Sequence, residues 1–109
     1  MSAVRERVEH TLGPAARIPL GEGREFIVGG VRIAVFRLRT GGLAATAAAC
    51  PHRGGPLADG ITGARQVVCP LHGRRFSLDT GEAEGGAYAV PCFPVRLGPG
   101  GEIVVSLPG

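Results

Sequence analysis

Aromatic residues are scarce in this sequence, and long apolar runs are absent. Tryptophan does not occur, and Phe and Tyr together make up only 5% of the 109 residues. The core must therefore be aliphatic and modest, so that a metal site would help to hold a small domain together. No segment approaches the roughly 18 apolar residues of a membrane span, and the first ten residues lack the apolar stretch of a secretory signal. We expect a soluble, cytoplasmic protein with no membrane partner.

Clustered positive charge is also missing. Twelve Lys and Arg against nine Asp and Glu give a formal net charge of +3, and the basic residues are scattered singly along the chain. Surfaces that bind nucleic acid concentrate positive charge in a patch or stripe. We therefore expect no nucleic-acid partner.

Sustained helical periodicity is the third absence. Short runs of Val, Ile and Phe alternate with turn residues, and the chain contains 19 Gly and 9 Pro. This pattern is typical of an all-β protein of one domain, here residues 1–109. Gly29 and Gly30 predict a hairpin turn between two of the strands. The predicted strands are residues 26–28, 31–38, 43–49, 66–68, 76–78, 93–97 and 102–107.

Two loops, residues 50–56 and 69–74, are rich in Pro and Gly and carry the candidate metal ligands. The first loop reads C-P-H-R-G-G and the second C-P-L-H-G-R, so that each has one cysteine and one histidine. The candidate ligands are Cys50, His52, Cys69 and His72. A histidine falls at a chosen offset only roughly 3% of the time in this composition, so chance explains the repeated pairing poorly.

Three chemistries remain for these side chains. Buried thiols with hydrogen-bonded histidines need no metal at all. Zinc is a second reading, although zinc-finger spacing pairs Cys with Cys and His with His, whereas each loop here mixes the two types. The mixed pattern suits a [2Fe–2S] cluster in which one iron takes both cysteines and the other takes both histidines.

On these motifs, the segment from about residue 21 to 107 resembles the Rieske iron–sulfur domain. The resemblance implies a small antiparallel β-sandwich with a cluster-binding subdomain at one tip, and one [2Fe–2S] cluster per chain. It places Cys50, His52, Cys69 and His72 at the ligand positions. With no open coordination position implied, the chain would carry single electrons and catalyse no reaction alone.

Departures from the family pattern indicate its lower-potential, ferredoxin-type branch. High-potential members typically carry an extra cysteine in each loop, where this chain has Gly55 and Leu71. They also place Ser and Tyr after the second histidine, where it has Arg74 and Phe76.

Phrases such as CPHRGGPLADG and CPLHGRRFSLDTGEA resemble the small subunit of assimilatory NAD(P)H-dependent nitrite reductase. That resemblance implies a larger reductase partner of the flavin and sirohaem type. The alternative is a free ferredoxin that delivers electrons to a ring-hydroxylating oxygenase.

The other conspicuous side chains receive simpler interpretations. Cys92 is predicted to be a small buried side chain, because the four ligand positions are already filled. His10 receives no role. Three arginines flank the ligand loops, namely Arg53, Arg74 and Arg75. They could contact an acidic partner, favour the reduced cluster, or simply be solvated.

Overall fold

Strands and tight turns make up nearly all the regular structure of the chain. A computed structural model describes residues 7–51, 54–71, 73–86 and 88–108. The strands are β1 (Arg7–Pro14), β2 (Glu22–Val28), β3 (Val31–Arg37), β4 (Leu43–Ala47), β5 (Ile61–Thr62), β6 (Gln66–Val68), β7 (Arg75–Ser77), β8 (Cys92–Phe93), β9 (Val95–Leu97) and β10 (Glu102–Pro108). Two single-turn 3₁₀ helices, η1 (Ala15–Arg17) and η2 (Leu57–Asp59), are the helical elements of the described residues. No helix in this part of the chain is long and apolar enough to cross a membrane.

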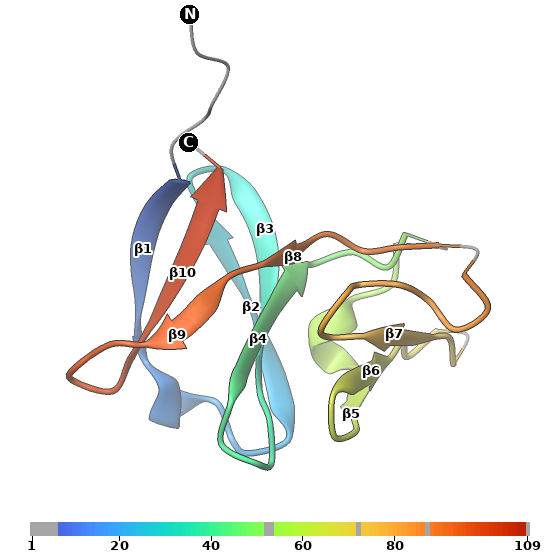
Figure 1. Cartoon of the computed structure of the whole chain (residues 1–109), viewed down its shortest axis with the longest axis horizontal. Helices are drawn as coiled ribbons and strands as arrows, with labels where there is room; N and C mark the ends of the chain where they lie inside the picture. The colour runs from blue at the N-terminus through green and yellow to red at the C-terminus, as the bar shows by residue number, and fades with distance from the viewer. Residues whose placement is uncertain (1–6, 52–53, 72, 87, 109) are drawn as a thin grey trace, which may run out of the picture.

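Two antiparallel sheets form a large lobe, and a third forms a small lobe beside it (Figure 1). The sheets have the strand orders β1-β10-β9, β2-β3-β4-β8 and β5-β6-β7. Apolar side chains from the first two sheets meet in one buried cluster that includes Val35 of β3 and Val105 of β10. The all-β prediction, with a sandwich and a smaller subdomain, is confirmed.

The central strand β3 is buried on both faces. Ile33 and Val35 point into the core of the sandwich. Ala34 and Phe36 alternate with them and belong to the second buried cluster, which lies between this sheet and the small lobe. Side chains alternate sides along a strand, so a continuous apolar run serves two cores at once. One face of the sheet that contains β3 is therefore covered by the sandwich core, and the ligand loops pack against its other face.

The small lobe joins the sandwich through hydrogen bonds as well as apolar contacts. The Thr62 hydroxyl donates to the Gly21 carbonyl at 2.6 Å, and the Leu57 N–H donates to the Ala48 carbonyl at 3.0 Å. Within the lobe, Arg65 Nε donates to Asp79 Oδ1 at 2.8 Å. This pairing lowers the pKa of the Asp79 carboxyl and raises the pKa of Arg65. Two hydrogen bonds thus hold the lobe against the sandwich, and the Arg65–Asp79 ion pair joins two segments within the lobe.

The strand predictions hold best where a turn marks the boundary. The hairpin at Gly29 and Gly30 is confirmed, with Val28 opposite Val31, and residues 66–68 form β6 as expected. The strand predicted at 43–49 ends at Ala47, and the one predicted at 76–78 begins one residue earlier.

One predicted strand is interrupted, and two strands were not anticipated. The strand expected over residues 93–97 is divided at Pro94, because proline has no N–H to donate to a sheet. Its two parts, β8 and β9, belong to different sheets. The unanticipated strands are β1, which holds His10, and the two-residue β5.

Candidate metal centre

The first ligand loop is a tight turn closed by two backbone hydrogen bonds. The Cys50 N–H donates to the Gly55 carbonyl at 2.8 Å, and the Gly54 N–H donates back to the Cys50 carbonyl at 2.6 Å. Gly54 has a φ of +74°, in the left-handed region that side chains disfavour. A glycine four residues after the cysteine is therefore needed to close this turn.

The second loop repeats this construction. The Cys69 N–H donates to the Arg74 carbonyl at 2.8 Å, and the Gly73 N–H donates to the Cys69 carbonyl at 3.0 Å. Gly73, again four residues after the cysteine, has a φ of +70°. In both turns the cysteine N–H and the cysteine carbonyl are hydrogen-bonded within the turn. The two cysteines therefore have equivalent backbone hydrogen bonding.

The two loops pack directly on each other at Gly55. A Cβ at this position would lie 3.1 Å from the Cys69 sulfur and 2.9 Å from Leu71 Cγ, closer than side chains normally approach. Cys50 and Cys69 are 2% and 1% exposed and share the buried cluster on the outer face of β3. The fold therefore brings the two predicted cysteine ligands together, from facing loops, in a water-poor site.

The predicted histidine ligands His52 and His72, together with Arg53, lie outside the described residues. In sequence, each histidine falls between the cysteine and the turn-closing glycine of its loop. The described residues alone gather no group of three or more His, Cys, Asp or Glu side chains. A complete ligand set on these loops would thus need the two histidines in addition to the thiols.

The residues of this site fit a [2Fe–2S] cluster. Two buried cysteines on facing loops are suited to one iron, and the absence of a side chain at Gly55 makes room there for the Cys69 sulfur and the Leu71 side chain. Two histidines, one within the sequence of each loop, would supply neutral nitrogen ligands for the second iron.

Cys92 lies elsewhere, in β8 opposite Thr46 of β4. It is half-buried, so it is less buried than the sequence predicts. Burial and, secondarily, the charge of Asp79 raise the pKa of the Cys92 thiol. The thiol therefore stays protonated at neutral pH, which makes it a poor nucleophile and a poor metal ligand.

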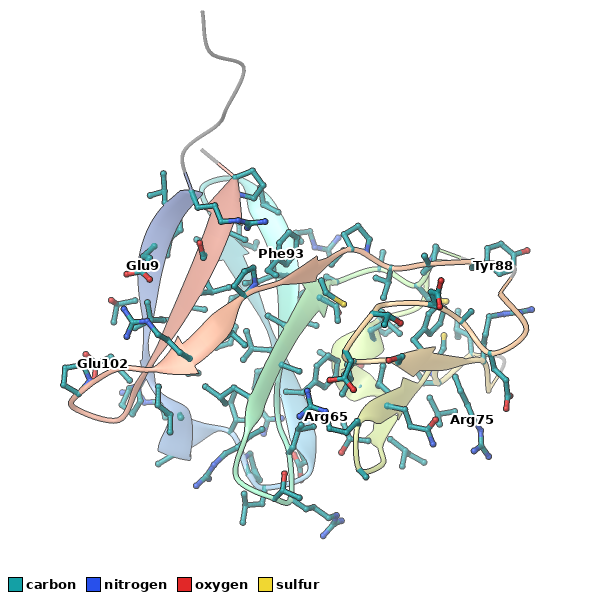
Figure 2. The ribbon with its side chains drawn as sticks, viewed as in Figure 1. Glu9, Arg65, Arg75, Tyr88, Phe93 and Glu102 are labelled. Carbon is teal, nitrogen blue, oxygen red and sulfur yellow. The ribbon has the colours of Figure 1, made fainter. Side chains whose placement is uncertain are left out.

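The two described arginines beside the loops are in different environments. Arg75 is exposed, whereas Arg74 is half-buried, with its guanidinium carbon 4.7 Å from the centre of the Tyr88 ring. Figure 2 shows Tyr88 at the outer end of the small lobe. No sequence pattern indicated a role for Tyr88. It is the single tyrosine of the chain, but it lies 14 residues from Arg74, and no local pattern connects the two.

A small β-domain that presents paired Cys and His loops at one end is the architecture of an iron–sulfur electron carrier. The Rieske [2Fe-2S] domain model matches residues 9–95, and the chain belongs to this family. It therefore transfers electrons through a Rieske-type [2Fe–2S] cluster.

This chain covers very different shares of the lengths of its individual relatives. Mouse apoptosis-inducing factor 3 is 32% identical over 92 residues, which span 83% of this chain and only 15% of the mouse protein. The ferredoxin component of the naphthalene 1,2-dioxygenase system of Pseudomonas aeruginosa is 35% identical over 82 residues, covering 73% of this chain and 78% of the ferredoxin.

Among solved structures, a Mycobacterium tuberculosis protein assigned as an NADH-dependent nitrite reductase small subunit matches closely. The two chains are 28% identical and superpose with a TM-score of 0.89. The alignment covers 95% of this chain and 98% of the other. The present chain thus shares its fold with that protein over nearly the whole length of both chains.

Proposed function

We propose that residues 1–109 form one domain that binds a single [2Fe–2S] cluster. Its ligands are Cys50, Cys69, His52 and His72. We further propose that the chain is the cytoplasmic small subunit of an NAD(P)H-dependent nitrite reductase. The observation that supports the ligand set best is the matched pair of turns, with both thiols buried in the same cluster. When bound, the cluster supplies a centre that takes up and releases one electron at a time.

The chain's own residues hold and shield this centre. Gly54 and Gly73 close the two turns, and their hydrogen bonds fix the cysteine backbones. Burial of the thiols excludes water from the cysteine side of the site. Preorganised ligands of this kind reduce the structural change that accompanies gain or loss of an electron.

The nitrite reductase assignment is supported by the match with the Mycobacterium tuberculosis small subunit, which extends over nearly the whole of both chains. Its test is reconstitution of the candidate large subunit with NAD(P)H and nitrite, with and without this chain. We expect nitrite consumption to require the loaded chain. Cys69→Ser should abolish the activity, and Cys92→Ser, a matched thiol replacement away from the loops, should retain it.

The second candidate is a ferredoxin that serves a ring-hydroxylating oxygenase, favoured by the 35% identity to the Pseudomonas aeruginosa ferredoxin component. The same preparation should be offered to such an oxygenase with a suitable reductase and an aromatic substrate. Efficient product formation there, together with nitrite consumption that does not depend on this chain, would decide for the ferredoxin function.

The reduction potential is expected near the bottom of the Rieske range, at roughly −150 mV rather than +300 mV. Phe76 is fully buried and apolar, and neither it nor Arg74 offers a hydroxyl to the cluster sulfurs. Gly55 and Leu71 face each other where high-potential relatives carry a disulfide. Protein-film electrochemistry provides the measurement, and a clearly positive value would show that other groups dominate the potential.

A further inference from the structure

Arg74 connects a ligand loop to a partly buried positive charge. Its backbone carbonyl accepts the hydrogen bond from the Cys69 N–H, so the residue is part of the turn that holds this cysteine. Its side chain is half-buried, and its guanidinium lies over the Tyr88 ring. The charge is therefore held in a defined place on the small lobe.

No group among the described residues neutralises this charge. The ion pairs found there are Arg24–Glu22, Arg32–Glu25, Arg65–Asp79 and Arg96–Glu9, and none involves Arg74. Arg74 Nε is buried and has no hydrogen-bond acceptor within the described part of the chain. The guanidinium therefore has no counter-charge in this part of the chain, and its Nε edge is shielded from water.

Tyr88 is placed to hold the guanidinium. The Tyr88 carbonyl accepts a hydrogen bond from the Ala83 N–H at 2.7 Å, and Glu82 pairs with Ala89 beside it. These backbone interactions hold the segment that carries the Tyr88 ring. The attraction between a cation and the face of an aromatic ring then holds the Arg74 guanidinium against this ring.

We propose that Arg74 raises the affinity of the cluster for its electron and that Tyr88 is the residue that positions it. The inference rests on the ligand set proposed above. Gain of one electron makes the centre more negative, and a fixed positive charge that is poorly screened by water favours this reduced state. The exposed neighbour Arg75 carries the same charge but is surrounded by solvent, which screens it.

The test compares two single substitutions that remove one positive charge each. In loaded protein, Arg74→Gln is expected to lower the affinity for the electron about tenfold, which is a fall of about 59 mV in midpoint potential for a one-electron couple. Arg75→Gln should change it less than about threefold, and 1 M salt, with a Debye length of about 3 Å, should remove that change. Equal shifts for the two variants, or no shift for Arg74→Gln, would overturn the proposal.

Substitutions at Tyr88 test the positioning role. Tyr88→Leu removes the aromatic face and should reproduce part of the Arg74→Gln shift, whereas Tyr88→Phe keeps the ring and should leave the potential unchanged. The double variant Arg74→Gln/Tyr88→Leu should shift no further than Arg74→Gln alone, because both changes act through one charge. Additive shifts would contradict a positioning role for Tyr88.

Iron and acid-labile sulfide content distinguishes this proposal from the one on which it rests. If the unmodified chain takes up neither, the ligand assignment itself fails. A fully loaded Arg74→Gln protein with an unchanged potential would overturn only the role of Arg74.

Discussion

Replacing Cys69 by serine is expected to abolish cluster binding and to unfold much of the small lobe. The thiol is 1% exposed and lies in the apolar cluster shared by the lobe and the sandwich. Serine would put a hydroxyl in this site and remove the thiolate that an iron ion requires. Because metal binding contributes directly to the folding free energy of a small domain, stability should fall together with iron content.

The measurement is iron and acid-labile sulfide per chain, with thermal unfolding followed by circular dichroism. The unmodified protein should hold two of each, and Cys69→Ser close to none. Cys92→Ser provides the control, since this thiol lies in β8 and plays no part in the loops. Zinc without sulfide in the unmodified protein would show that the site holds a different metal.

The proposed histidine ligands are tested in the same way. His72→Ala should lose the cluster as completely as Cys69→Ser, because the second iron would lack one of its two nitrogen ligands. A folded His72→Ala protein with its full complement of iron and sulfide would contradict the assignment of His72.

The second large effect is expected at Gly81. A Cβ there would lie 2.0 Å from the Val90 carbonyl oxygen, a backbone atom that cannot rotate away, and the φ of +83° is itself unfavourable for alanine. The Val90 N–H donates to the Gly81 carbonyl at 2.7 Å, so the two segments cannot separate without losing this bond. Gly81→Ala should cost about 2–5 kcal/mol of unfolding free energy, from left-handed strain and overpacking combined.

Gly85→Ala separates the two contributions. Gly85 has a similar φ of +89°, but a Cβ there would meet nothing within 4 Å. Its replacement should therefore cost only the conformational strain, about 1–2 kcal/mol. Urea denaturation of both variants provides the comparison, and equal losses would mean that the close contact with Val90 relaxes without penalty.

Local chemistry explains which parts of the fold were predictable. The hairpin at Gly29 and Gly30 and the tight turns after Cys50 and Cys69 depend on residues that are neighbours in sequence. Glycine and proline constrain such turns wherever they occur in a chain. These features, and the family resemblance carried by the two ligand motifs, could accordingly be predicted from the amino-acid sequence alone.

Predictions were poorest for strands at the edges of sheets. β1 is largely exposed and mixes charged with apolar residues, so it shows no clear alternation, and it becomes a strand because β10 pairs with it. The residues on either side of Pro94 were correctly expected to be extended. Their division between two sheets depends on their partners, since Phe93 pairs with β4, far earlier in the chain, and Val95 pairs with β10.

By itself, the sequence determined the candidate metal ligands, their spacing within each loop and the glycines that close the turns, because these are short-range properties of the chain. Only the tertiary structure decided that the loops meet at Gly55 and that β3 serves a core on each face. It alone placed the Tyr88 ring over Arg74. The physical reason is that these contacts join segments distant in sequence, whose approach is set by the packing of whole sheets and not by the preferences of the residues that touch.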